Sequence, residues 1–327
     1  MQPAENPITS VGDGEWTRWV LAQRPQRNTL NSVKPHGFFL EEERSGLGDV
    51  IKCGVILLTN KECPWRCLMC DLWKNTLTHS VRSGAIAKQI RFALSQLGCC
   101  PDQIKLYNSG SFFDSAAIPV GDYPTIVDAV SGARQVVVES HPRLLGEKAL
   151  HLRDLLPGKL EVAMGLETIH PQVLPRLNKR FDLGHFQRAT EFLRNATIGV
   201  RAFVLVKPPF MDEEEGVDWA VKSAAFAFEC GAQVVSLIPT RAGNGALERL
   251  MEAGQFMPPK LASLERALER ALALAGGRVF ADTWDLQQFS SCSACLEKRR
   301  ERLHKMNLAQ QVLPTIRCLL CGTGLET

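Results

Sequence analysis

The fold of this chain is decided by the stretch Cys63-Pro64-Trp65-Arg66-Cys67-Leu68-Met69-Cys70, which spaces three cysteines as C-x3-C-x2-C. Thiolates at this spacing can converge on one face of a loop. A closed tetrahedral zinc site needs four ligands, so three cysteines better suit a four-iron cluster whose fourth iron stays open. An open iron can bind a substrate or a cofactor, which predicts chemistry at this loop. The alternatives are a buried apolar cluster and an isolated disulfide.

The residues before the cysteines indicate where this loop lies in the fold. Val55 to Thr59 form an apolar, β-branched run of the kind that fills a buried parallel strand, and Asn60 and Lys61 end it. The cysteines therefore follow the carboxyl end of a first strand, which is where α/β barrels carry their active sites.

The cysteine loop resembles the signature of the radical S-adenosylmethionine (SAM) superfamily, which places C-x3-C-x2-C after the first barrel strand. The resemblance implies a 4Fe–4S cluster on Cys63, Cys67 and Cys70, whose open iron chelates the amino and carboxylate groups of SAM. One electron from the reduced cluster would then cleave SAM to a 5′-deoxyadenosyl radical that takes a hydrogen atom from the substrate. Met69 departs from the pattern, because the family commonly has an aromatic residue there.

Length and composition limit the classes of protein to consider. The 327 residues suit one large domain with an appendage, or two domains, and 45% apolar residues support a sizeable core. No apolar run approaches the length of a membrane span, so we expect no membrane association. Residues 1–13 lack the order of a signal peptide, and 11 cysteines point to reduced thiols and metal, so we expect the cytoplasm. A net charge of +3 is too small to argue for nucleic acid.

From residue 51 a short apolar strand and an amphipathic helix alternate. After the first strand we expect strands at 103–107, 135–138, 160–164, 200–206 and 234–238, with helices near 83–98, 122–132, 143–156, 184–195, 213–229 and 260–275. This alternation predicts an α/β fold, a partial (β/α)6 barrel of the TIM type, with a flavodoxin-like doubly wound sheet as the alternative. We divide the chain into an N-terminal extension (1–50) with a short helix at 16–21, the barrel (51–278) and a cysteine-rich C-terminal segment (279–327) that opens on a possible strand at 279–282.

Small and acidic residues follow three of the strands. The resemblance implies that the loop with Ser109, Gly110 and Ser111 holds the SAM amino group, although the same residues suit an ordinary turn. Glu139 and Glu167 each follow an apolar run, where a carboxylate can accept hydrogen bonds from ribose hydroxyls or an ammonium group. The alternative for each is a solvated surface acid.

Arg201 interrupts the apolar strand at 200–206, and a charge inside a buried strand is costly unless it is paired. We expect it to pair with the SAM carboxylate or with Glu167, unless it faces an edge. Lys207 is a second candidate cation, and the loop at 240–245 is a candidate lining for adenine or substrate. His141 and His170 are expected to be exposed loop residues.

A second group of cysteines lies near the C-terminus. Cys292 and Cys295 form one C-x2-C pair, Cys318 and Cys321 form another, and 22 residues separate the two pairs. Four thiolates in this arrangement predict a zinc site, and an auxiliary iron–sulfur cluster is the alternative. The basic segment at 298–305 between the pairs suits phosphate contacts or a solvated helix face. Four further cysteines show no ligand spacing and are interpreted as core residues: Cys53, Cys99, Cys100 and Cys230.

The string at 165–174, with Leu177-Asn178-Lys179, resembles the elongator/MiaB-like branch of the radical SAM superfamily. The segments at 108–114, 139–140 and 207–210 look most like the radical SAM subunit of archaeosine synthase and its uncharacterised relatives. This resemblance implies modification of a tRNA nucleoside, with tRNA and an external one-electron donor as partners. The alternatives are radical SAM maturation of a peptide or small metabolite, and a non-catalytic binding protein stapled by metal.

Overall fold

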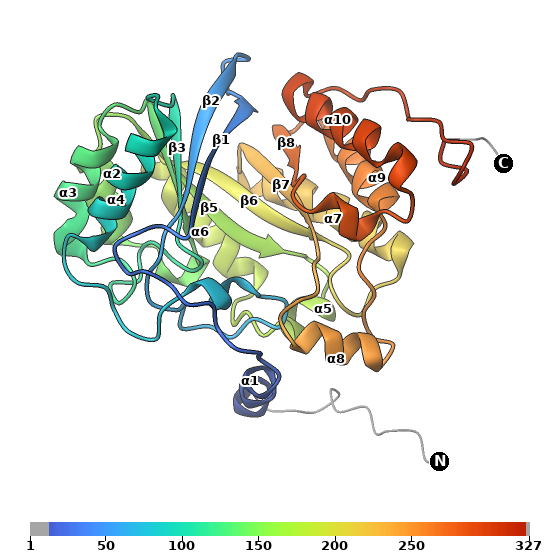
Figure 1. Cartoon of the computed structure of the whole chain (residues 1–327), viewed down its shortest axis with the longest axis horizontal. Coiled ribbons are helices and arrows are strands. Elements are labelled where there is room, and N and C mark those ends of the chain that lie inside the picture. Colours follow the sequence, from blue (N-terminus) through green and yellow to red (C-terminus); the bar gives the residue numbers. More distant parts are fainter. Residues whose placement is uncertain (1–12, 325–327) are drawn as a thin grey trace.

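The computed structural model describes residues 13–324, whose strands form a single curled sheet in the order β1-β2-β3-β4-β5-β6-β7-β8 (Figure 1). The strands are Gly37–Arg44 (β1), Val50–Leu57 (β2), Gln103–Tyr107 (β3), Gln135–Ser140 (β4), Lys159–Glu167 (β5), Gly199–Val206 (β6), Val234–Pro239 (β7) and Arg278–Ala281 (β8). β1 is antiparallel to β2, and the later neighbours are parallel. The predicted α/β partial barrel is confirmed.

Helices follow most of the strands, as the alternation predicts. The α-helices are Asp13–Ala22 (α1), Ala85–Leu97 (α2), Tyr123–Val130 (α3), Glu147–Leu155 (α4), Val173–Arg176 (α5), Leu183–Asn195 (α6), Glu213–Cys230 (α7), Ala246–Glu252 (α8), Leu261–Leu272 (α9) and Ser293–Ala309 (α10). The 3-10 helices are Leu72–Asn75 (η1), Val120–Asp122 (η2), Pro142–Leu144 (η3) and Leu286–Phe289 (η4). α1 covers the short helix expected at 16–21.

The sequence did not predict β1, and the reason is its charge pattern. The strand carries three consecutive acidic residues, Glu41, Glu42 and Glu43, and this pattern is not typical of a buried strand. In the structure Glu41 and Glu43 point to the interior of the half barrel, where both contact Lys105 of β3. β1 and β8 are the two edge strands of the sheet. They come from the N-terminal and C-terminal segments, which the sequence-based division had placed outside the barrel.

The two faces of the sheet differ in burial. Ile56, Leu106 and Val138 face outward and are fully buried in the core beneath the helices. Residues that alternate with them on the interior face, such as Tyr107 and Phe203, are only half-buried. Solvent therefore reaches the interior of the half barrel at the level of these two residues, whereas Lys105 and Arg201, deeper on the same face, are buried.

A second, smaller core lies at the end of the sheet where α1 and α8 gather (Figure 1). Trp16 of α1 and Leu247 of α8 pack in one cluster with Leu68 of the cysteine loop. The N-terminal extension and α8 thus cover the loop that carries the predicted cluster ligands.

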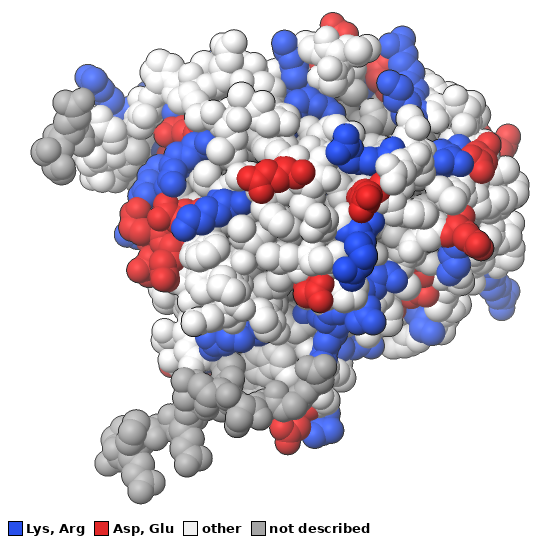
Figure 2. All heavy atoms as spheres, turned by 180° about the vertical axis from the view of Figure 1, so that it is seen from behind, with Lys and Arg blue, Asp and Glu red and all other residues white. Residues whose placement is uncertain are grey.

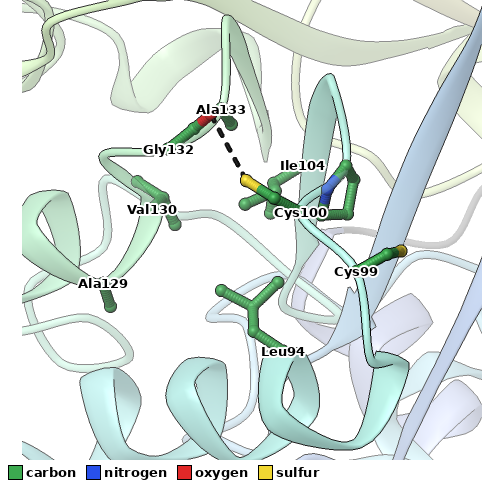
Figure 3. Close-up of a pocket in the computed structure, with 9 residues that line it drawn as sticks. Leu94, Cys99, Cys100, Ile104, Ala129, Val130, Gly132 and Ala133 are labelled. Atoms are coloured by element: carbon green, nitrogen blue, oxygen red, sulfur yellow. Dashed lines mark hydrogen bonds between the residues drawn. The ribbon is translucent and has the colours of Figure 1, made fainter.

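A small apolar pocket lies between α2, the start of β3 and the turn after α3 (Figure 3). Leu94, Ile104 and Val130 line it together with Cys99 and Cys100. Cys100 is exposed, with its Sγ 3.5 Å from the Gly132 carbonyl oxygen, so the interpretation of Cys100 as a core residue is wrong. Cys99 is half-buried at the same rim.

Candidate active site

The cysteine loop follows β2 at the carboxyl end of the sheet and is tied first to the N-terminal segment. Glu62, next to Cys63, accepts a hydrogen bond from Arg24 at 2.7 Å, contacts Arg27, and lies 3.2 Å from Arg66 within the loop. These three guanidinium groups hold the pKa of Glu62 below its usual range although burial acts in the opposite direction. The carboxylate therefore stays charged and anchors the loop.

Backbone groups of the loop are held from two further segments of the chain. The Leu68 N–H donates to the Leu177 carbonyl at 2.9 Å, and the Asn178 amide donates to the Arg66 carbonyl at 2.6 Å. From the loop after β7, the Asn244 amide donates to the carbonyls of Leu68 at 2.7 Å and Cys70 at 3.3 Å. The loop is thus positioned before any ligand binds, which favours a defined site.

Cys63, Cys67 and Cys70 are half-buried free thiols. Burial raises the pKa of each thiol to about 12, so the thiolates need a cation to form. Within residues 13–324, the group of three or more candidate ligands whose atoms all lie within 4.8 Å of one another is that of the four C-terminal cysteines. Cys63, Cys67 and Cys70 do not form such a single-ion group, and sulfurs bound to three different irons of a cluster lie further apart than sulfurs bound to one ion.

The loop after β3 lies directly against the first of these cysteines. A Cβ atom added at Gly110 would come within 3.1 Å of the Cys63 Cβ, so glycine permits this close approach. Ser109 adopts a positive φ of 54°, and the Ser111 hydroxyl accepts a hydrogen bond from the His141 N–H at 2.9 Å. The structure therefore brings Ser109–Ser111 beside the cluster loop, and their contact with SAM stays a prediction.

Glu139 organises this loop from the end of β4. Its carboxylate accepts hydrogen bonds from the Asn108 N–H at 2.5 Å and the Gly110 N–H at 3.3 Å. Burial raises the pKa of Glu139 to about 7, although the backbone donors oppose the shift. The Asn108 side chain is fully buried, and neither of its polar atoms has a protein partner. Such atoms at a strand end are what a bound polar ligand or water would satisfy.

Glu167 pairs with a residue that the sequence analysis missed. Its carboxylate contacts the buried ammonium group of Lys179, and both side chains approach Gly165 so closely that any Cβ there would overlap them. Burial lowers the pKa of Lys179, but Glu167, Cys67 and Cys63 outweigh it and raise the pKa. The sequence offered one clue to Lys179, which is its place in the Leu177-Asn178-Lys179 string. It directly follows two residues that bind the cysteine loop.

Arg201 lies in a different set of contacts from those expected. It donates to Glu43 at 2.5 Å and to Glu161 at 2.7 Å. Glu167 pairs with Lys179, and Arg201 pairs with Glu43 and Glu161, so the expected Arg201–Glu167 pair is wrong. Arg201 comes early in β6, whereas the cysteine loop follows the carboxyl ends of the strands. Burial opposes ionisation of Glu43, but Arg201 and Lys105 hold its pKa well below the usual range.

His141 is buried rather than exposed, which corrects the expectation from sequence. Its ring stacks on Trp65 of the cysteine loop, with centroids 3.8 Å apart and planes 3° from parallel. Its Nε2 lies 2.8 Å from the Lys179 carbonyl oxygen. Burial, then the Lys179 charge, lowers the pKa of His141 to about 3, so the imidazole is neutral. Among the other candidates, Lys207 forms an ion pair with Glu213 at 2.6 Å.

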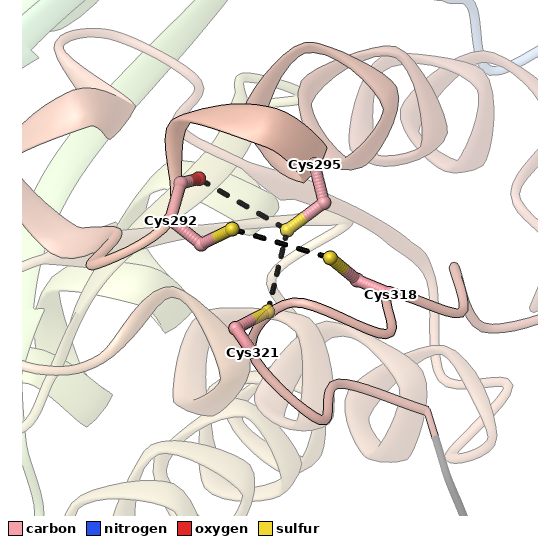
Figure 4. Close-up of side chains that lie close together, drawn as sticks. All are labelled: Cys292, Cys295, Cys318 and Cys321. Atoms are coloured by element: carbon pink, nitrogen blue, oxygen red, sulfur yellow. Dashed lines mark hydrogen bonds between the residues drawn. The ribbon is translucent and has the colours of Figure 1, made fainter.

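The four C-terminal cysteines converge on one point (Figure 4). The sulfurs of Cys292 and Cys318 are 4.0 Å apart, and those of Cys295 and Cys321 are 3.7 Å apart. Burial raises the pKa of the Cys295 thiol to about 12, whereas a hydrogen bond with Thr323 lowers that of Cys321 to about 6. The structure thus forms the predicted four-thiol group.

The basic segment beside this group is engaged in ion pairs. Arg299 pairs with Glu265 at 2.7 Å, and Arg302 with Glu269 at 2.6 Å, which joins α10 to α9. On the exposed side, Lys305 lies 2.8 Å from Glu301. Arg299 and Arg302 are buried and fit neither expectation, whereas the exposed Lys305–Glu301 pair fits the solvated helix face. Figure 2 likewise shows basic and acidic side chains interspersed over the face seen from behind.

No protein-family model matches the chain. It is 24% identical to an uncharacterized protein of Methanocaldococcus jannaschii over 88% of this chain and 84% of that protein. It is 30% identical to archaeosine synthase subunit beta of Thermococcus kodakarensis, over 56% of this chain and 59% of that subunit.

Two solved structures share the fold. Elp3 from Methanocaldococcus infernus matches with a TM-score of 0.51 and 16% identity, over 71% of this chain and 60% of that one. A radical SAM methyltransferase from Sphaerobacter thermophilus matches with a TM-score of 0.50 and 14% identity, over 76% and 77%. The chain therefore has the same kind of α/β partial-barrel fold as these two proteins. Within residues 13–324, no helix has the length and apolar character that crossing a bilayer requires.

Proposed function

We propose that this chain, a radical SAM protein by its fold and its cysteine loop, is an enzyme that cleaves SAM reductively and modifies a nucleoside in tRNA. The observation that carries the proposal is the approach of Gly110 to Cys63, which puts the loop at 109–111 against the first of the three free thiols. When bound, a 4Fe–4S cluster would supply the electron that releases a 5′-deoxyadenosyl radical from SAM. An external one-electron donor would reduce it.

The chain's own residues have separate parts in this proposal. Cys63, Cys67 and Cys70 would hold the cluster, because they are unpaired thiols on one fixed loop. Ser109–Ser111 would bind the SAM amino group, and Glu139 holds their backbone in place through its hydrogen bonds to Asn108 and Gly110. Exclusion of water would fall to the aromatic and apolar cover around the loop, which protects a reactive carbon radical from unwanted donors.

Glu167 remains a candidate contact for the polar groups of SAM. Its carboxylate is fixed by Lys179, which leaves its second oxygen available for a ribose hydroxyl or an ammonium group. The backbone of Glu167 has a positive φ of 64°, a conformation that costs energy for a residue with a side chain. A carboxylate that stands on strained backbone, at a strand end beside the thiols, supports a binding role for Glu167.

The tRNA substrate is supported by similarity to archaeosine synthase subunit beta, which covers 56% of this chain. The paired cations of α10 lend no support to phosphate binding there. A peptide or small metabolite is the second candidate, favoured by the mixed charge of the surface in Figure 2. Open thiols and a reduced cluster need a reducing compartment, so we place the protein in the cytoplasm.

We assign zinc to the C-terminal cysteines. A tetrahedral ion with Zn–S bonds of about 2.3 Å has sulfurs roughly 3.8 Å apart at each edge. The observed 4.0 Å and 3.7 Å separations match that edge, whereas cysteines on separate irons of a cluster would be more widely spread. The ion would fix the C-terminal segment against the start of α10.

The test is to reconstitute the protein anaerobically, add SAM and dithionite, and measure 5′-deoxyadenosine by mass spectrometry. We expect product from the native protein and none from the triple variant Cys63→Ala, Cys67→Ala, Cys70→Ala. Normal product formation by that variant would refute the proposal.

The substrate is tested separately, by incubation with total tRNA and nucleoside mass analysis. A SAM-dependent mass shift in one nucleoside is expected, together with RNA binding that weakens steeply as salt rises. SAM cleavage without any change in tRNA, but with a change in a peptide or metabolite, would support the second candidate.

A further inference from the structure

The open side of the half barrel carries an aromatic pair that the proposed chemistry does not use. Trp284, in the loop after β8, has 47% of its surface exposed, and its ring centroid lies 4.6 Å from that of Phe39. Phe39 is on β1 and shares the interior face with Glu41 and Glu43, both of which contact Lys105. β1 and β8 are the two edges of the sheet, so this pair spans the gap between them, here called the seam.

The backbone of Trp284 is fixed in place. Its N–H donates to the Asp282 carboxylate at 2.9 Å, and its carbonyl accepts a hydrogen bond from Arg241 at 2.8 Å. Arg241 also pairs with Asp282 at 2.8 Å. A large exposed indole on a rigid backbone presents a preorganised surface and loses little conformational entropy when it binds a ligand.

The same segment connects the seam to the cysteine loop. Arg241 is three residues before Asn244, whose amide binds the carbonyls of Leu68 and Cys70. The charge of Arg241 also acts on Asp71, the residue after Cys70. Trp284 therefore lies at the end of the seam where the loop after β7 reaches the cysteine loop.

Aromatic residues continue from the seam across the interior face. Phe203 and Tyr107 meet edge to face with centroids 6.0 Å apart, although β6 and β3 are not neighbours in the sheet. Ser236 lies in register between Phe203 and Phe280. Aromatic faces with a small residue between them suit a flat ring better than a branched aliphatic group.

We propose that Trp284 stacks on the planar heteroaromatic ring of the substrate, a nucleobase, with Phe39 supporting the indole from the other side of the seam. The inference rests on the proposed function, because it names the part of the substrate that the same site recognises. Stacking on an aromatic side chain tolerates different bases, since every base has a π-face. It therefore selects a nucleobase over an aliphatic peptide side chain.

The experiment uses the reconstituted full-length protein with SAM and the fluorescent nucleoside 2-aminopurine riboside, whose emission is quenched by stacking. The variants are Trp284→Phe, which keeps a ring, and Trp284→Leu, which keeps apolar volume without one. We expect the native protein and Trp284→Phe to bind within about threefold of each other, and Trp284→Leu to bind about tenfold more weakly. Zinc content and thermal unfolding verify that both variants are folded.

Binding by Trp284→Leu equal to that of the native protein overturns the inference, and so does absence of probe binding by the native protein. If Trp284→Leu does not fold, Trp284→Phe decides the question. A loss of probe binding in that variant, which retains an aromatic ring, also overturns the inference. 5′-Deoxyadenosine formation by the native protein is measured in parallel. Its absence counts against the proposed function, whereas the binding comparison decides the role of Trp284.

Discussion

Lys179 forms a buried ion pair with Glu167 beside the cysteine loop. The same ammonium group also interacts electrostatically with the thiols of Cys63 and Cys67. Burial raises the pKa of Cys63 and Cys67, and the Lys179 charge opposes that shift. The lysine thus lowers the cost of forming thiolates in a poorly solvated loop. It also joins the end of β5 to the loop that follows β2.

Replacement of Lys179 by methionine is therefore expected to impair cluster assembly. The change leaves Glu167 buried without its partner, which costs about 3–5 kcal/mol of the free energy of unfolding. Iron per chain after anaerobic reconstitution should fall well below that of the native protein. Lys179→Arg keeps the charge and is the matched control, expected to retain more iron. Full iron loading of the methionine variant would contradict the assigned role.

Glu139 makes stability depend on pH. Its pKa of about 7 in the folded protein lies above the ordinary value of 4.5, so the folded state keeps a proton that the unfolded state has lost. The contribution is complete below pH 4.5 and is lost as the pH rises to about 7. The free energy of unfolding of the native protein should thus fall over this range by about 1–3 kcal/mol more than that of Glu139→Gln. Denaturant titrations of both proteins at several pH values measure this, and parallel curves would be the contrary result.

Replacement of Arg201 by methionine should destabilise the protein and leave SAM binding intact. The change removes the guanidinium shared by Glu43 and Glu161, which leaves Glu43 with Lys105 and Glu161 with the Gln135 amide, at a cost of about 3–5 kcal/mol. Arg270→Met breaks a surface pair with Asp218 and should cost less than about 1 kcal/mol. Denaturant unfolding and equilibrium dialysis with SAM separate the two effects. A selective loss of SAM affinity in the folded Arg201 variant would restore the role that the sequence suggested.

The two cysteine groups should bind different metals independently. Cys318→Ser removes one of four thiolates, so zinc should fall from about one per chain to near zero while iron at the other loop is kept. Cys230→Ser is the control, because this free cysteine is outside both groups. Elemental analysis of anaerobically prepared protein gives both metals. Loss of about four irons in place of zinc would identify a second cluster.

Local spacing and alternation were enough to predict several parts of the molecule. The C-x3-C-x2-C loop after an apolar run placed three thiols at the carboxyl end of a strand, because a short loop cannot carry them elsewhere. Two C-x2-C pairs predicted the four-thiol group, since nearby cysteines in one turn point the same way. The period of strands and helices predicted the partial barrel, because each parallel connection needs a crossover helix.

Contacts between residues distant in sequence could not be predicted in this way. Glu43 on β1 is 158 residues from Arg201, yet they form a buried pair, which explains why the acidic strand was missed and why Arg201 does not pair with Glu167. Similarly, Trp284 reaches Phe39 only because the sheet curls until its first and last strands approach. Neighbours along the chain were enough to indicate which residues can bind metal and where the strands from β2 to β8 lie, because both depend on local sequence. Only the tertiary structure decided which charges pair and which rings meet, because that depends on how the sheet closes.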